Sequence, residues 1–192
     1  MNVKAQGLLN GAAFVRERFG ADGLERVLAA CRPELRVRER LATSNAIHWI
    51  PQAELGELLG AADRVLGIGD GKMAEAIGAA SARRNLRHMA LRLAFFVARP
   101  EFLMRRVAGV WRQFNEHGEM LVRSFQDGRM TAELVGVPDP NAMVCCSVTG
   151  WLYEAGVATG MRDLIAEHTE CRGRGGARCL WSLRWSHGRA AR

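Results

Sequence analysis

Residues 145–179 read CCSVTGWLYEAGVATGMRDLIAEHTECRGRGGARC and contain four of the five cysteines together with one histidine. His168, Cys171 and Cys179 lie close enough in sequence to form three corners of a tetrahedral zinc site. The fourth ligand would be Cys145 or Cys146, if the helix that carries them packs over the hairpin that carries the others. The alternative is that these cysteines are small buried hydrophobes and that His168 is a surface histidine.

The turn RGRGGAR between Cys171 and Cys179 is rich in glycine, so its backbone can bring two thiolates to one ion. A metal held there would fix the preceding helix to the sheet, and its binding energy would contribute to folding. The segment is therefore expected to organise the rest of the chain.

The composition is that of a globular protein, with 48% hydrophobic and 24% charged residues in 192. We expect a single domain over residues 1–185, followed by a flexible basic tail over residues 186–192. The apolar runs are too short to span a bilayer, and residues 1–20 lack a signal-peptide pattern, which predicts a cytoplasmic protein. In a reducing compartment the cysteines would be free thiols or metal ligands rather than disulfides.

The formal net charge is +7, and only Lys4 and Lys72 among the 27 basic residues are lysines. The arginines are interspersed with acids, as Glu17 between Arg16 and Arg18 illustrates. This pattern favours a solvated basic surface over a nucleic-acid-binding stripe.

The first half of the chain predicts helices. The clearest covers residues 52–66, where apolar residues recur at three- and four-residue steps. A helix over residues 10–19 should be closed by Gly20, and a second should start at Asp22 and end at Pro33. Further helices are expected over 73–82, 86–98 and 101–114, an extended segment over 47–50, and a linker at the glycines of 67–71.

After Gly118 the period becomes that of strands. Residues 120–125 and 130–135 flank Asp127 and Gly128, a favoured hairpin turn, and residues 161–169 and 179–185 predict a second hairpin. Between the hairpins lies a helix capped by Asn141. The predicted fold class is α+β, with an N-terminal helical layer packed on a small antiparallel sheet made of two hairpins separated by a helix.

This order of elements, with C-x7-C followed by W-x3-W at the end, resembles the 4-vinyl reductase family. Its superfamily also covers haem NO-binding domains and TRAPP-complex subunits. AFVRERFG, AADRVLG and CRGRGGARC are similar to an uncharacterised set of myxobacterial type within it. The resemblance covers residues 11–185.

The resemblance implies a zinc site, because aromatic-sensing activators of this family bind zinc through one helical cysteine, two hairpin cysteines and a carboxylate. Cys145, Cys171 and Cys179 match the cysteine positions, and Gly150 keeps the C-x4-G spacing. His168 replaces the acid, and imidazole is itself a zinc ligand.

The same resemblance implies a domain without haem. The haem branch carries Tyr-x-Ser-x-Arg at its propionate clamp, whereas the single tyrosine here, Tyr153, continues as YEAGV. We therefore expect structural zinc and no haem.

No nucleophile, base and orienting acid occur together, so we expect no enzyme. The resemblance implies a sensory or regulatory domain that encloses an apolar small molecule and signals through a protein partner or a dimer change. Candidate pocket walls are His88, Phe96, Trp111 and Phe125. The alternative is an assembly protein of TRAPP-subunit type, with a core filled by its own side chains and no ligand.

A homodimer is also expected. Domains of this type pair through N-terminal helices, and residues 11–30 place Phe14, Leu24 and Val27 on faces that a small helical pair could hardly bury alone.

Overall fold

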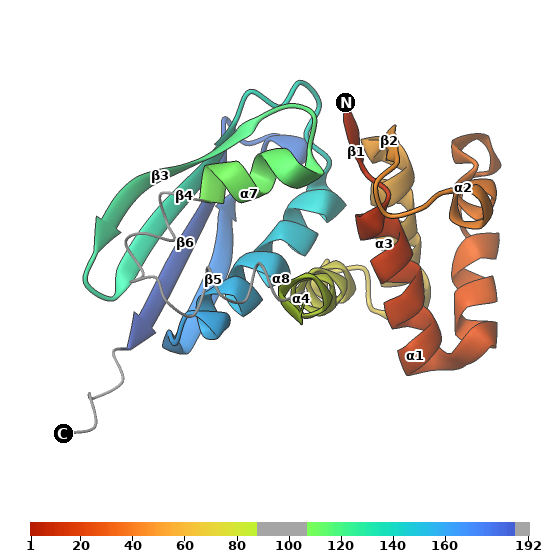
Figure 1. Ribbon diagram of the computed structural model, residues 1–192, viewed down its shortest axis with the longest axis horizontal. Helices are drawn as coiled ribbons and strands as arrows, with labels where there is room; N and C mark the ends of the chain where they lie inside the picture. The colour runs from red at the N-terminus through yellow and green to blue at the C-terminus, as the bar shows by residue number, and fades with distance from the viewer. Residues whose placement is uncertain (88–106, 187–192) are drawn as a thin grey trace.

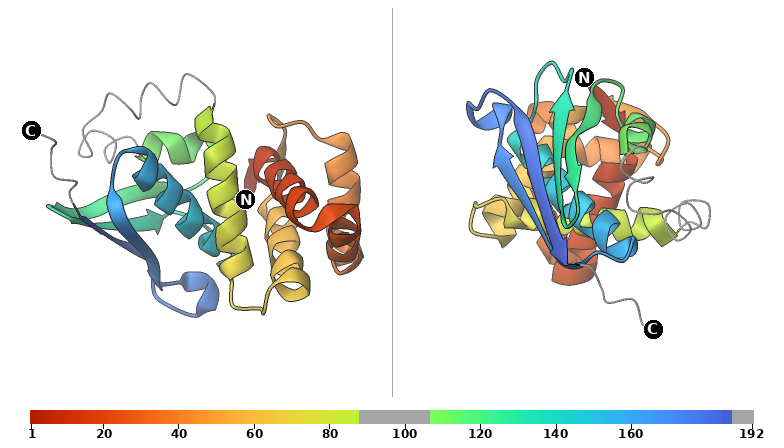
Figure 2. Two further views of the ribbon diagram at one scale, coloured as in Figure 1. Left: turned by 90° about the horizontal axis from the view of Figure 1, so that it is seen from below. Right: turned by 90° about the vertical axis from the view of Figure 1, so that its left-hand side faces the viewer.

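The computed structural model describes residues 1–87 and 107–186, which form a helical layer and a sheet layer (Figure 1). Two helices, α4 and α8, lie between the N-terminal helices and the sheet (Figures 1 and 2). The helices of the described residues are α1 (Gln6–Ala29), α2 (Val37–Thr43), α3 (Gln52–Leu66), α4 (Lys72–Arg87), α7 (Val107–Phe114) and α8 (Ala142–Ala158), with 3-10 turns at Pro33–Leu35 and Arg172–Arg174.

The predicted helix over residues 52–66 is confirmed with the same bounds as α3. The prediction of two N-terminal helices that meet at Gly20 is confirmed, because α1 (Gln6–Ala29) consists of two helical segments on either side of a kink at Gly20. Gly20 has φ 76°, a conformation that glycine adopts without the steric cost of a Cβ, so it bends the chain and helix resumes after it. The short helix α2 was not predicted, since residues 35–45 show little periodicity.

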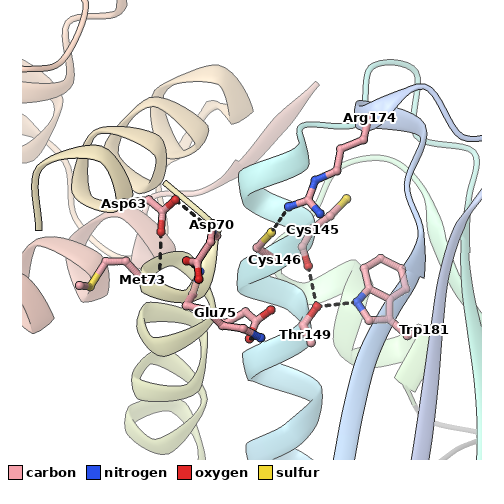
Figure 3. A network of polar contacts seen from close by, with 11 residues as sticks. Asp63, Asp70, Met73, Glu75, Cys145, Cys146, Thr149, Arg174 and Trp181 are labelled. Carbon is pink, nitrogen blue, oxygen red and sulfur yellow. Dashed lines mark hydrogen bonds and ion pairs between the residues drawn. The ribbon is translucent and has the colours of Figure 1, made fainter. Parts of the chain in front are cut away.

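The glycine-rich connection of residues 67–71 is a turn, as predicted, and a buried carboxylate holds it. Asp63 accepts hydrogen bonds from the backbone nitrogens of Gly71 (2.8 Å) and Met73 (3.1 Å), as Figure 3 shows in part. These bonds satisfy donors at the start of α4, where a helix has no partners of its own. The turn is therefore part of the α3–α4 packing.

The predicted fold class is confirmed, and the two hairpins join into one antiparallel sheet of order β3-β4-β6-β5. The join is the β4–β6 ladder, in which Ala132 pairs with Trp181 and Leu134 with Cys179. A separate ribbon pairs β1 with β2, and β2 lies in the segment predicted to be extended. The strands are β1 (Asn2–Lys4), β2 (Trp49–Pro51), β3 (Glu119–Gln126), β4 (Arg129–Val135), β5 (Arg162–Glu170) and β6 (Cys179–Ser186).

The N-terminal helices bury the side chains that were expected at a dimer interface. Val27 is 0% exposed and Leu24 is 4% exposed, both within the core formed by α1 and α3, while Phe14 is half-buried against that core. The placement of Val27 in an interface is therefore wrong, because α3 covers it within one chain. The homodimer itself stays a prediction.

The predicted helix over 86–98 falls largely outside the described residues, and its first two residues belong to α4. Of the predicted helix over 101–114, residues 107–114 are described and form α7. Among the described residues, no helix is long and apolar enough to cross a membrane.

Helices α4 and α8 cross in backbone contact at two glycines. A Cβ added to Gly78 would lie 1.9 Å from the Ser147 carbonyl oxygen, and one added to Gly150 would lie 1.9 Å from the Glu75 carbonyl oxygen. Both obstacles are helix backbone, which cannot turn aside as a side chain can. Any larger residue at either position must push the two helices apart.

We predict that Gly150→Ala lowers the free energy of unfolding by about 3 kcal/mol, as expected for overpacking against backbone. Gly109→Ala is the matched control, because a Cβ at Gly109 in α7 meets no atom of the described residues within 4 Å. That control should be neutral or stabilising by up to about 1 kcal/mol. Urea denaturation measures both, and equal stability of the two variants would contradict the backbone contact.

Candidate functional site

The four predicted metal ligands come together at one end of the sheet. Cys145 lies in the first turn of α8, His168 lies in β5, Cys171 directly follows β5 and Cys179 begins β6. One ligand atom from each residue lies within 4.8 Å of the other three. The sulfurs of Cys145 and Cys179 are 3.9 Å apart, against about 3.8 Å for two thiolates in a tetrahedral site with Zn–S of about 2.3 Å.

The cluster is shielded from water, and this burial determines which of its side chains are charged at neutral pH. Burial, and then the neighbouring thiols of Cys179 and Cys171, raise the pKa of Cys145 far above the ordinary range. Burial, and next the positive charge of Arg174, lower the pKa of His168 to about 4. At neutral pH the imidazole is therefore uncharged and able to donate a lone pair, whereas the Cys145 thiolate requires a cation beside it.

His168 is the most informative member of the cluster. Both of its ring nitrogens are buried and lack a well-formed hydrogen bond to the described residues, although the Glu170 backbone lies near enough to oppose, weakly, the lowering of the His168 pKa. Buried polar atoms are rarely left in this state unless an ion, a water or a ligand completes them. An ion bound to the three cysteine sulfurs would also be coordinated by one of these nitrogens.

Two residues that the sequence did not single out hold this imidazole and α8 in place. The Trp181 ring stacks on His168 with centroids 4.4 Å apart and planes within 10°. Its Nε1 donates to the Thr149 hydroxyl (2.9 Å), which donates to the Cys145 carbonyl (3.2 Å) (Figure 3). In the sequence, Trp181 stood out only as the first tryptophan of the W-x3-W pattern, with no role at the metal site.

The structure decides between Cys145 and Cys146 as the helical ligand. Cys146 lies on another face of α8, where the Arg174 guanidinium donates to its sulfur (3.1 Å) (Figure 3). A Cβ added to Gly71 would lie 2.8 Å from the same sulfur. Cys146 therefore packs against the start of α4 and Cys145 faces the cluster.

A second candidate site is an apolar cavity of about 130 Å³ between the N-terminal helices, α4, α7 and α8. Residues from both layers line it, so it lies where the helical layer meets the sheet layer. Its apolar walls include Leu59, Ile77, Trp111, Val144, Val148 and Trp151. Such a lining suits a small molecule that is mostly apolar.

Of the predicted pocket residues, Trp111 lines this cavity. Phe125 is not among its described lining residues and packs instead near Trp185, with ring centroids 5.8 Å apart. His88 and Phe96 lie outside the described residues. The sequence missed Ser81 and Asn85, two polar lining residues four positions apart on α4.

Comparison with known proteins identifies the fold. No protein-family model and no curated protein sequence matches the chain. Among solved structures, the Fe(II) unliganded H-NOX protein from K. algicida has a TM-score of 0.73 at 12% identity, covering 98% of this chain and 100% of its own. The Fe(II)NO form of an H-NOX protein from S. oneidensis has a TM-score of 0.69 at 13% identity, covering 94% and 99%.

The chain has the H-NOX fold. This agrees in part with the resemblance, whose superfamily includes haem NO-binding domains. The closer assignment to 4-vinyl reductases, and the likeness to TRAPP subunits, stay predictions. At 11–13% identity the likeness shows the fold alone.

The prediction of a haem-free domain is contradicted by this comparison. The structural neighbours include H-NOX proteins in Fe(II) and Fe(II)NO states and a structure described as probing heme distortion in the H-NOX family. The missing Tyr-x-Ser-x-Arg motif is a local feature of the sequence. A local motif does not exclude a cofactor from a fold that extends over almost the whole chain.

Haem requires an apolar cavity for its porphyrin and a side chain that binds its iron. The apolar walls of the cavity suit the faces of a porphyrin, and the thioether of Met120, a lining residue, belongs to a class of iron ligand used in haem proteins. No histidine occurs among the described lining residues. The described part of the cavity thus suits the macrocycle by its polarity but not by its volume, because about 130 Å³ holds a molecule of about the size of benzene.

Proposed function

We propose that this chain is a sensory domain that binds a small, mostly apolar molecule in the cavity between α4, α7 and α8. The observation that carries the proposal is the cavity itself, which has apolar walls from both layers and lies at their junction. The H-NOX fold supports it, because structures with this fold are described with iron and NO bound. Haem needs more space than the described residues enclose, so the proposal is for a smaller molecule, and absorption spectroscopy tests haem separately.

Helix α8 would transmit the binding event. Val144, Val148 and Trp151 face the cavity, while Cys145 and Thr149 on another face contact the cluster and the sheet. A ligand that changes the position of α8 therefore acts on both sites. The output passes to a protein partner or to a changed homodimer, and no catalytic step is assigned.

A zinc ion at Cys145, His168, Cys171 and Cys179 would have a structural part in this domain. Four protein ligands close a tetrahedral site and leave no position for substrate. The ion would join α8 to the hairpin β5–β6 and supply the cation that the Cys145 thiolate requires. Support comes from the His168 nitrogens, which lack a well-formed hydrogen bond to the described residues, and from the sulfur spacing.

The ligand is tested by native mass spectrometry and absorption spectroscopy of freshly purified protein. We expect about one small molecule per chain, which a Soret band would identify as haem. Val148→Trp should fill the cavity and abolish this binding, whereas Val157→Trp on the exposed face of the same helix should retain it. A wild-type protein that carries nothing, whether or not haem was supplied during expression, would contradict the proposal.

The metal is tested by elemental analysis of protein prepared without chelators. We expect about one zinc per chain, with loss of the metal and a clear fall in thermal stability for Cys171→Ser. Cys31→Ser is the control and should keep its zinc, because Cys31 packs against the core of α1 and α3. A metal-free wild type with five titratable thiols in the folded state would refute the site.

Zinc affinity should rise with pH. The raised pKa of Cys145 means that this thiol is protonated before zinc binds, so binding releases a proton. His168, with a pKa of about 4, is already neutral at pH 6 and contributes no such change. Chelator competition should show at least about a tenfold gain in affinity per pH unit between pH 6 and 8, and a flat profile would contradict the burial of the thiol.

A further inference from the structure

One face of α4 gives the cavity a polar end. Ile77, Ser81 and Asn85 are spaced by four residues and all line the cavity, so they form one stripe along the helix. Ser81 is 8% exposed and Asn85 is 6% exposed. A hydroxyl and a carboxamide therefore face an interior space whose other walls are largely apolar.

Polar groups away from water lose free energy unless they are hydrogen-bonded. Asn10 on α1 donates its side-chain amide to the Asn85 carbonyl oxygen (3.3 Å), which fixes the orientation of the carboxamide. That carboxamide also carries two N–H donors, and the Ser81 hydroxyl is both a donor and an acceptor. The pair can thus bind an oxygen atom from two directions.

Two other polar lining residues are held by the protein itself. The Lys4 ammonium donates to the Ile47 carbonyl (2.7 Å) and lies 3.9 Å from the centroid of the Trp49 ring. The Asn115 amide donates to the Trp111 carbonyl (3.0 Å). These contacts direct both groups to protein partners. Ser147 on α8 is a single lining hydroxyl, whereas Ser81 and Asn85 place two polar groups one helical turn apart, which makes the α4 pair the better-placed ligand contact.

We infer that Ser81 and Asn85 recognise the polar end of the ligand, a largely apolar molecule that carries a hydroxyl or carbonyl group. The inference rests on the proposed function and specifies the chemistry of the same cavity. The apolar walls bind the body of the molecule, and the α4 pair fixes its direction in the cavity. Ser81 and Asn85 are specificity residues in this arrangement.

The experiment compares two probes that differ by one hydroxyl, 2-naphthol and naphthalene, by fluorescence titration of the full chain. Wild-type protein should bind 2-naphthol about tenfold more tightly, as one or two buried hydrogen bonds allow. Ser81→Ala and Asn85→Leu should each reduce this preference to within about twofold. Ser147→Ala removes a lining hydroxyl from α8 instead and should keep the preference.

Thermal melting checks that each variant is folded, and Ser81→Ala, the smaller change, decides the result if Asn85→Leu unfolds. Equal binding of both probes by the wild type would overturn the inference while leaving the proposed function in place. An unchanged preference in Ser81→Ala, or its loss in Ser147→Ala, would also overturn it. If neither probe binds, the result counts against the ligand-binding cavity, and therefore against the inference and the proposed function alike.

Discussion

The contact on which the rest of the structure depends is the crossing of α4 and α8 at Gly78 and Gly150. Each glycine faces a backbone carbonyl of the other helix, so the helices approach as closely as their main chains permit. This approach sets the rotation of both helices. It places Ser81 and Asn85 beside the cavity on α4, and directs Cys145 and Thr149 of α8 to the sheet.

The cysteine–histidine cluster depends on that geometry. Cys145 reaches the hairpin because α8 is held at a fixed height over β6, where Trp181 bonds to Thr149 and stacks on His168. Burial then leaves a neutral imidazole, whose ring nitrogens lack a well-formed hydrogen bond to the described residues, beside the Cys145 thiol, whose pKa is raised. Such a cluster is stable in two forms, as protonated thiols in a dry core or as thiolates around a cation. An imidazole without a well-formed hydrogen bond favours the form with a cation.

The H-NOX fold at 12% identity shows how little of this architecture depends on particular side chains. For the same reason, the absence of the Tyr-x-Ser-x-Arg motif at Tyr153 does not exclude haem from a protein with this fold. Ser81, Asn85 and Met120 are among the residues that line the cavity, and in the proposed function such residues would select the ligand.

The sequence by itself determined the elements whose signals are local. The stripe of α3, the Asp127-Gly128 turn, the Asn141 cap and the alternation of β6 are each set by neighbours within a few residues, and all are present. The metal-ligand set was also predicted from sequence, through spacing and resemblance, and the structure brings its four residues together.

Some residue contacts depend on how distant segments are rotated against one another. Only the tertiary structure decided these contacts. Residue spacing left Cys145 and Cys146 open and the resemblance selected Cys145, whereas the α4–α8 crossing supplies the physical reason, since it turns Cys145 to the hairpin and Cys146 to Arg174. Val27 was expected at a dimer interface because its covering helix α3 lies far along the chain. The polar pair on α4 shares this property, since a serine and an asparagine among small residues acquire a role only when another helix encloses them.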